Sequence, residues 1–262
     1  KLVDQGVAAG KLQAFANTSA KSLVVENGRI KGVVTDRGTI EADYVMVCTG
    51  IWGRLTAALV GEDLPVMPID HPLTFFGPYN EFAGTGKEIG WPLLRDQGNS
   101  AYMRDTGDPK TAEGGQIEWG YYEETNPRLC HPRDLLEKDQ ARLSPSQRDL
   151  DMEQIMAPLE RAMELTPILG ELGYNEGHSF NGLLQVTTDG GPSMGESQKV
   201  RGLWYAVAIW VKDGPGMGKL IADWMTDGRT EVDHHAIDYS RFYPHQTQEQ
   251  FIWDRCTETA MK

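Results

Sequence analysis

The stretch AIWVKDGPGMGKLIADWMTDG, residues 208–228, contains the change of secondary structure around which the rest of the chain can be arranged. An apolar run leads into it and predicts a strand over Leu203–Val211. After a turn with three glycines and a proline, five apolar residues recur at helical spacing: Met217, Leu220, Ile221, Trp224 and Met225. This spacing predicts a helix with one buried face, and Gly228 predicts its end.

A strand that turns into a helix through glycines leaves free backbone N–H groups and the positive end of the helix dipole at the turn. Such a corner suits an electron-rich or anionic group. An ordinary strand–turn–helix unit of an α/β protein explains the same pattern equally well, so the stretch alone does not predict a ligand.

The composition is that of a globular protein with enough residues for one large domain or two modest ones. The chain has 262 residues, of which 40% are hydrophobic and 24% are charged. Its formal net charge of -13 argues against nucleic acid or an anionic membrane as a partner. The sequence has no apolar run long enough to predict a transmembrane helix.

The three cysteines, Cys48, Cys130 and Cys256, are far apart and form no CxxC pair. We therefore expect neither a disulfide framework nor a zinc site, and we expect a reducing, cytoplasmic environment. The chain opens at Lys1 as if within a helix, which favours a fragment or a processed product.

Residues 20–48 alternate in the manner of strands, and Asn27-Gly28 predicts a hairpin between the first two. The apolar run Tyr44–Cys48 predicts a strand buried on both faces of a parallel sheet. It ends at Thr49-Gly50, where the missing side chain would let a ligand approach the backbone. A helix is expected over residues 52–60.

Residues 65–125 contain β-branched and aromatic runs broken by Gly, Pro and Asn, which predict antiparallel strands of a sheet with one exposed face. Residues 134–173 predict helices, and Pro158 is expected to start a new helix or to kink the existing one. A strand over Phe180–Val186 and a turn-rich loop over residues 188–195 follow.

This order predicts an α/β (α+β) fold in which a nucleotide-type domain is interrupted by an antiparallel-sheet domain with helices. The nucleotide-type domain would comprise residues 1–60 and 188–230, and the inserted domain residues 61–187. Residues 231–262 form a polar tail with a helix expected from about Thr247, and this tail would lead into a further domain.

Three stretches together resemble a known family: residues 27–53 (NGRIKGVVTDRGTIEADYVMVCTGIWG), residues 180–196 (FNGLLQVTTDGGPSMGE) and residues 202–228. The family is that of the D-amino-acid-oxidase-like FAD oxidoreductases. Trp210-Val211, the segment PIDHPLT at 68–74 and the tail segment IDYSRFYPHQ at 237–246 resemble the branch that contains dimethylglycine oxidase and the dimethylglycine and sarcosine dehydrogenases.

The resemblance implies a Rossmann-like FAD-binding domain, a substrate domain and FAD-dependent oxidation of an N-methylated glycine, dimethylglycine or sarcosine. It implies a small-molecule amine substrate and a folate-binding domain or subunit as partner. The family's GxGxxG fingerprint and the histidine that attaches FAD covalently in several members would both precede Lys1, so we expect the C-terminal two-thirds of an oxidase module. Asp213 replaces a histidine of the relatives, and Pro72-Leu73 replaces Gln-Tyr, which leaves the exact substrate open.

Two residues are candidates for the chemistry. An unperturbed imidazole titrates near physiological pH, so His71 could accept the proton of the substrate amine, and it matches the active-site histidine of the relatives. Tyr102 matches an active-site tyrosine and could hydrogen-bond the substrate. A hydrogen-bonded strand histidine and a packed tyrosine are the structural alternatives. Arg95 or Arg104 could pair with a substrate carboxylate, although a surface ion pair explains each of them as well.

The resemblance also implies a set of flavin contacts: Ala20, Gly50, Trp52, Trp210, Val211, Lys212, Asp213, Gly214 and Gly216. Ala20 enters only because the relatives place a backbone contact to adenine there. Lys212, together with the helix start, could stabilise negative charge on the reduced flavin.

No metal site is predicted. His234, His235 and His131 could suggest a metal, but adjacent histidines in a strand point to opposite faces, and no third ligand sits at a useful spacing. Two alternatives to the oxidase stay open. The chain could be a non-catalytic fragment or subunit that does not hold FAD itself, or a related FAD enzyme for another amino acid or a polyol.

Overall fold

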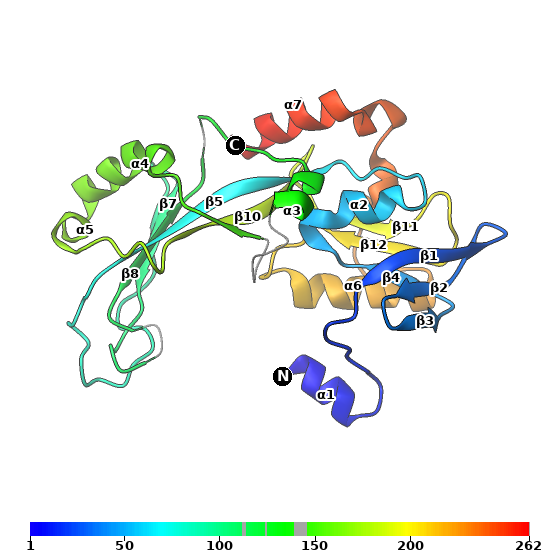
Figure 1. Cartoon of the computed structure of the whole chain (residues 1–262), viewed down its shortest axis with the longest axis horizontal. Coiled ribbons are helices and arrows are strands. Elements are labelled where there is room, and N and C mark those ends of the chain that lie inside the picture. Colours follow the sequence, from blue (N-terminus) through cyan, green and yellow to red (C-terminus); the bar gives the residue numbers. More distant parts are fainter. Residues whose placement is uncertain (112–113, 124, 139–145, 262) are drawn as a thin grey trace.

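The computed structural model describes residues 1–111, 114–123, 125–138 and 146–261, which form three β-sheets with helices packed on them (Figure 1). The chain begins with helix α1 (Leu2–Ala8), none of whose side chains is buried. An antiparallel sheet follows, made of β1 (Ala20–Glu26), β2 (Arg29–Thr35) and β3 (Gly38–Glu41). Asn27 and Gly28 join β1 to β2 with φ angles of 50° and 72°, as a two-residue hairpin turn requires, which confirms the predicted hairpin.

The second sheet has the strand order β11–β12–β4, with β11 (Ser193–Glu196), β12 (Leu203–Val207) and β4 (Val45–Val47). β12 pairs with β4 in parallel, so the carboxyl ends of both strands lie at the same edge. β4 continues into the 3-10 helix η1 (Gly50–Trp52) and helix α2 (Gly53–Ala58). β12 continues through the glycine-rich turn into α6 (Gly214–Asp227).

Helix α6 confirms the predicted strand–turn–helix unit. All five apolar residues of its predicted face pack in one cluster with Met194 of β11 and Trp204 of β12. Gly228 follows with φ 66°, a left-handed C-cap that few other residues adopt.

Three expectations for this region were wrong. The strand ends at Val207, not Val211, because Ala208 leaves the extended region with φ 55°. β4 is not buried on both faces, because the cluster under α6 does not include Met46, which is 36% exposed. The loop expected over residues 188–195 gives way to strand β11 at Ser193, which pairs with Val207 of β12.

The third sheet is the predicted antiparallel one, in the order β6–β7–β8–β5–β10–β9. Its strands are β5 (Val66–Phe76), β6 (Leu94–Asp96), β7 (Ala101–Asp105), β8 (Ile117–Tyr121), β9 (Gln147–Arg148) and β10 (Phe180–Thr187). One face packs under α4 (Met152–Leu165) and α5 (Ile168–Glu171), with Trp119, Ile155 and Leu169 in the shared core (Figure 1). Helix α3 (Pro132–Lys138) lies in the connection from β8 to β9. The opposite face of β7 and β8 therefore remains free to line a site.

Pro158 lies inside α4 and does not start a new helix. A proline has no N–H to donate to the carbonyl four residues earlier. That carbonyl belongs to Gln154, and it accepts a hydrogen bond of 2.9 Å from the Tyr121 hydroxyl instead. The sheet thus supplies the donor that the helix lacks at this point.

The tail returns to the body of the molecule. After η2 (Tyr239–Arg241) and η3 (Pro244–Thr247), helix α7 (Glu249–Ala260) begins two residues beyond the predicted start. Its Ile252 and Cys256 are fully buried against Met67 of β5. None of the helices in the described ranges combines the length and the apolar character needed to cross a membrane.

Candidate active site

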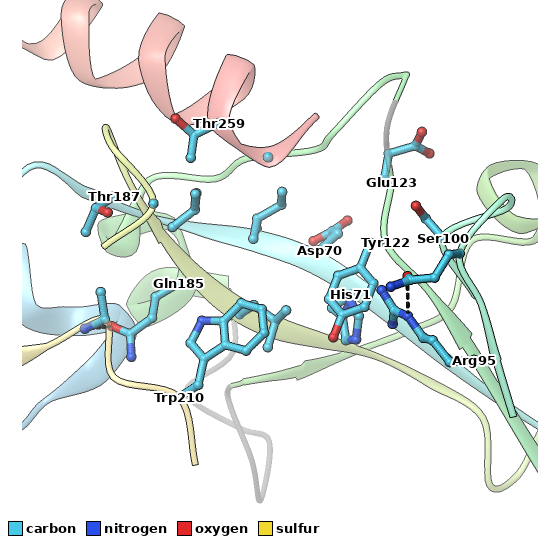
Figure 2. A pocket seen from close by; sticks show the side chains of 17 residues that line it. Asp70, His71, Arg95, Ser100, Tyr122, Glu123, Gln185, Thr187, Trp210 and Thr259 are labelled. Carbon is cyan, nitrogen blue, oxygen red and sulfur yellow. Dashed lines mark hydrogen bonds between the residues drawn. The ribbon is translucent and has the colours of Figure 1, made fainter. Parts of the chain in front are cut away.

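A pocket of about 520 Å³ lies where the turn after β12 meets the antiparallel sheet (Figure 2). Its walls come from β5, β10, the β6–β7 hairpin, the segment after β8, the turn after β12 and the end of α7. The lining side chains include His71, Arg95, Tyr122, Gln185, Trp210 and Thr259.

His71 and Tyr102 meet although another strand separates them. His71 lies on β5 and Tyr102 on β7, with β8 between them. On β8 the residue opposite Tyr102 is Gly120, and a Cβ atom there would lie 2.4 Å from the Tyr102 hydroxyl. The absent side chain lets the phenol cross β8, and its oxygen lies 2.9 Å from His71 Nε2.

The surroundings of His71 favour the neutral imidazole. Burial, and secondly the positive charge of Arg95, lower the pKa of His71 to about 4. The expectation that its ring titrates near physiological pH is therefore wrong. The backbone N–H of His71 donates to the buried Asn181 Oδ1 at 2.9 Å, and the Tyr122 ring lies 4.7 Å from the imidazole.

Tyr102 keeps its proton over a wide pH range. Burial, followed by the nearby Tyr122 and Glu118, raises the pKa of the Tyr102 phenol above its usual value. A neutral histidine can form this contact in either sense: the phenol donates to a bare Nε2, or Nε2–H donates to the phenol oxygen and leaves Nδ1 as an acceptor. The His71–Tyr102 pair is therefore uncharged, and its histidine lines the pocket.

Of the two candidate arginines, only Arg95 lines the pocket. Its guanidinium lies over the Tyr122 ring at 4.8 Å, and its Nε donates to Gln97 Oε1 at 2.9 Å (Figure 2). Arg104 forms an ion pair of 2.6 Å with Glu118. Among the described residues that line the pocket, Arg95 is the one with a permanent positive charge, so it is the candidate partner for a carboxylate.

The turn after β12 forms the opposite wall. The Trp210 ring is parallel to Tyr122 within 5° at a centroid distance of 6.2 Å, and Val211 is 97% exposed. Lys212 forms an ion pair of 2.8 Å with Asp213. Asp213, the N-cap of α6, makes no side-chain capping bond, so the start of the helix remains open.

The structure brings some of the predicted site residues together and not others. His71 and Trp210 line the pocket, and Tyr102 contacts His71. Ala20 is exposed at the start of β1, in the first sheet, and is not among the lining residues. The remaining predicted contacts are not among the lining residues: Gly50 and Trp52 belong to η1, Val211, Lys212 and Asp213 to the turn before α6, and Gly214 and Gly216 to the first turn of α6. Their role as flavin contacts stays a prediction.

Sequence reasoning missed several residues of the site. Tyr122 could have been found, because it continues the alternation of Glu118 and Gly120 beyond the end of β8. No sequence pattern pointed to Gln185 or Thr259 as site residues. They reach the pocket from β10 and from α7, which are distant from the other site residues in the sequence. The rejected metal candidates have other contacts: His234 packs on Trp224, and His235 pairs with Asp233.

Comparison with known proteins shows which family the sequence of this chain matches. Residues 2–224 match the model of the family described as FAD dependent oxidoreductase, and residues 227–262 match that of the FAD dependent oxidoreductase central domain. Mitochondrial sarcosine dehydrogenase from Homo sapiens is 25% identical over 238 residues, which are 89% of this chain and 24% of that protein. Mitochondrial dimethylglycine dehydrogenase from Rattus norvegicus is 24% identical over 212 residues, 80% of this chain and 24% of that protein.

A solved structure shares the fold. L-proline dehydrogenase from P. horikoshii superposes with a TM-score of 0.64 at 22% identity, over 86% of this chain and 54% of that one. The chain spans about a quarter of the length of the two curated relatives and about half of this structure.

Proposed function

The chain belongs to the FAD dependent oxidoreductase family, and from that premise we propose that its pocket serves the oxidation of an N-methylated glycine, sarcosine or dimethylglycine. The observation that carries the proposal is the neutral His71–Tyr102 pair beside Arg95, in a pocket whose other wall is the turn leading into α6. The names of the relatives support the substrate class.

Gly214, Gly216 and Trp52 fit the flavin end of FAD. A Cβ atom on Gly214 or Gly216 would meet no other atom within 4 Å, so packing within the protein does not require glycine there. Open glycines at an uncapped helix start allow a planar, electron-rich group to approach the backbone. The buried Trp52 Nε1 also has no hydrogen-bond partner in the described part of the chain. When bound, FAD would supply the acceptor of a hydride from the methyl carbon of the substrate.

The substrate would be held at two points. Arg95 would bind the carboxylate, which a guanidinium can contact through two N–H groups. The amine must be neutral to lose a hydride, and a neutral His71 can accept its proton or its hydrogen bond. A carboxylate at Arg95 would offset the charge that disfavours the imidazolium, so substrate binding would make His71 a stronger base.

The test is an anaerobic visible spectrum of the FAD-loaded protein before and after addition of sarcosine, dimethylglycine, glycine or proline. Bleaching by the two N-methylated glycines supports the proposal. Bleaching only by glycine or proline would assign the chain to oxidation of another amino acid and overturn the proposed substrate.

Replacement of His71 tests its role. His71→Ala should slow flavin reduction by about 10² or more, the usual contribution of a general base. His235→Ala is the matched control, because that side chain is 91% exposed and pairs with Asp233. Wild-type reduction in His71→Ala would remove His71 from the mechanism.

A further inference from the structure

Gln185 lies where three parts of the site converge. It belongs to β10, it lines the pocket, and its side chain reaches the turn that follows β12 (Figure 2). Its Oε1 accepts a hydrogen bond of 2.8 Å from the backbone N–H of Ala208. Its Nε2 lies 3.8 Å from the point where a Cβ atom on Gly50 would stand, at the carboxyl end of β4.

The orientation of this amide follows from its partner. A backbone N–H can only donate, so the oxygen of Gln185 must face Ala208 and the NH₂ group must face away. Among the described residues, none accepts a hydrogen bond from Nε2. Gly50 adopts φ 54° and carries no side chain, so the NH₂ group faces backbone and open space there.

Ala208 needs an external support. Its φ of 55° is a left-handed conformation that residues with a Cβ adopt rarely, and the residue is buried. Such strained residues persist when neighbouring groups hold them, and they cluster at ligand sites. This N–H donates its hydrogen bond to Gln185 Oε1, which belongs to the antiparallel sheet. A side chain from another sheet therefore contacts the start of the turn to Trp210 and α6.

We infer that Gln185 is a positioning residue of the flavin site: its oxygen holds the Ala208 turn, and its NH₂ group offers a hydrogen-bond donor to an electron-rich edge of the flavin. This inference rests on the FAD chemistry of the proposed function, but not on the identity of the amine. A donor at this edge favours the reduced flavin, whose ring carries more negative charge.

Two substitutions separate the two roles. Gln185→Glu keeps an oxygen for Ala208 but replaces the donor with negative charge. Gln185→Met removes both groups at nearly constant volume. Gln198→Glu is the matched control, because it introduces the same charge change at an exposed position beside Tyr239 and outside the pocket.

The experiment is a reductive titration of the FAD-loaded full chain without any amine, combined with hydrogen exchange of the Ala208 amide. Gln185→Glu should disfavour the reduced flavin at least tenfold, which is a midpoint potential about 30 mV more negative for a two-electron couple. It should leave the Ala208 amide protected. Gln185→Met should accelerate exchange of that amide at least tenfold, and the control should change neither quantity.

An unchanged potential in Gln185→Glu, or an equal shift in Gln198→Glu, overturns the inference. A protected Ala208 amide in Gln185→Met overturns the holding role. Since no amine is present, a shifted potential supports the inference even if neither sarcosine nor dimethylglycine bleaches the flavin. That result would reject only the proposed substrate.

Discussion

At the scale of the residue, the surroundings of His71 move its pKa well below the ordinary value of an imidazole. Burial disfavours the imidazolium first, and the Arg95 guanidinium adds to the effect, so the pKa falls to about 4. The same guanidinium is the candidate partner for the substrate carboxylate. Under the proposed function, binding of the substrate carboxylate and activation of His71 would therefore be coupled through Arg95.

Arg95→Met should raise the pKa of His71 above 4, because the nearby positive charge is gone, but burial should keep it below 6.5. The imidazole resonances of His71 in an NMR pH titration report this pKa directly. In the wild type the folded pKa lies below the unfolded one, so stability is lost as the pH falls from about 6.5 to 4. The variant should lose less stability over that window. Arg104→Met is the control, since Arg104 pairs with Glu118; an equal pKa shift there would contradict a specific role of Arg95.

At the scale of the element, the register of the strands brings His71 and Tyr102 together. Tyr102 on β7 faces Gly120 on β8, and Leu73 of β5 lies on the other side of the same glycine. A single missing side chain therefore opens the path along which the phenol reaches His71. Periodicity predicted the strands, but it could not predict which residues face one another across two of them.

Gly120→Ala should break the His71–Tyr102 hydrogen bond and leave the fold intact. The new methyl group would meet the end of the Tyr102 side chain, which can swing away, and not the backbone. Flavin reduction by substrate should slow about 3- to 10-fold, the worth of one hydrogen bond, and Tyr102→Phe should give a similar value. Stopped-flow reduction measures the rate, and urea unfolding should show a change in stability below about 1 kcal/mol.

The control for this variant is Gly98→Ala, where the added methyl group makes only an ordinary contact at 3.5 Å with Asp96. Equal slowing in both variants would mean that the effect does not pass through Tyr102.

At the scale of the whole molecule, one buried carboxylate links parts that are distant in sequence. Glu62, in the connection from α2 to β5, accepts hydrogen bonds from the hydroxyls of Tyr205 and Tyr239, each at 2.5 Å, and of Ser197 at 2.7 Å. A further hydrogen bond of 3.1 Å comes from the Lys199 amide. The carboxylate thus joins the sheet of β11, β12 and β4 to the tail segment. A second link is the buried Arg54, which pairs with Glu249 at the start of α7, the helix whose far end lines the pocket.

Glu62→Ala should lower the free energy of unfolding by about 3 kcal/mol or more, because it leaves several buried donors without an acceptor at about 1–3 kcal/mol each. Glu62→Gln should cost less, since its amide oxygen still accepts. Urea denaturation at neutral pH measures both. Equal stability of Glu62→Ala and Glu62→Gln would contradict the conclusion that oxygen acceptors at residue 62 link Tyr205 and Tyr239.

Local patterns in the sequence were enough to predict the strand–turn–helix unit at residues 203–228, the Asn27-Gly28 hairpin and the antiparallel sheet, whereas the flavin-dependent family was implied by the resemblance of three stretches to known proteins. Helical spacing and left-handed glycines depend on neighbouring residues, so they can be recognised without the fold. Only the tertiary structure decided the end of β12 at Ala208, the choice of Arg95 over Arg104, the low pKa of His71 and the presence of Gln185 and Thr259 in the pocket. These features arise from burial, charge and hydrogen bonds between residues that are far apart in sequence, and their strengths depend on distances in space that no local pattern contains.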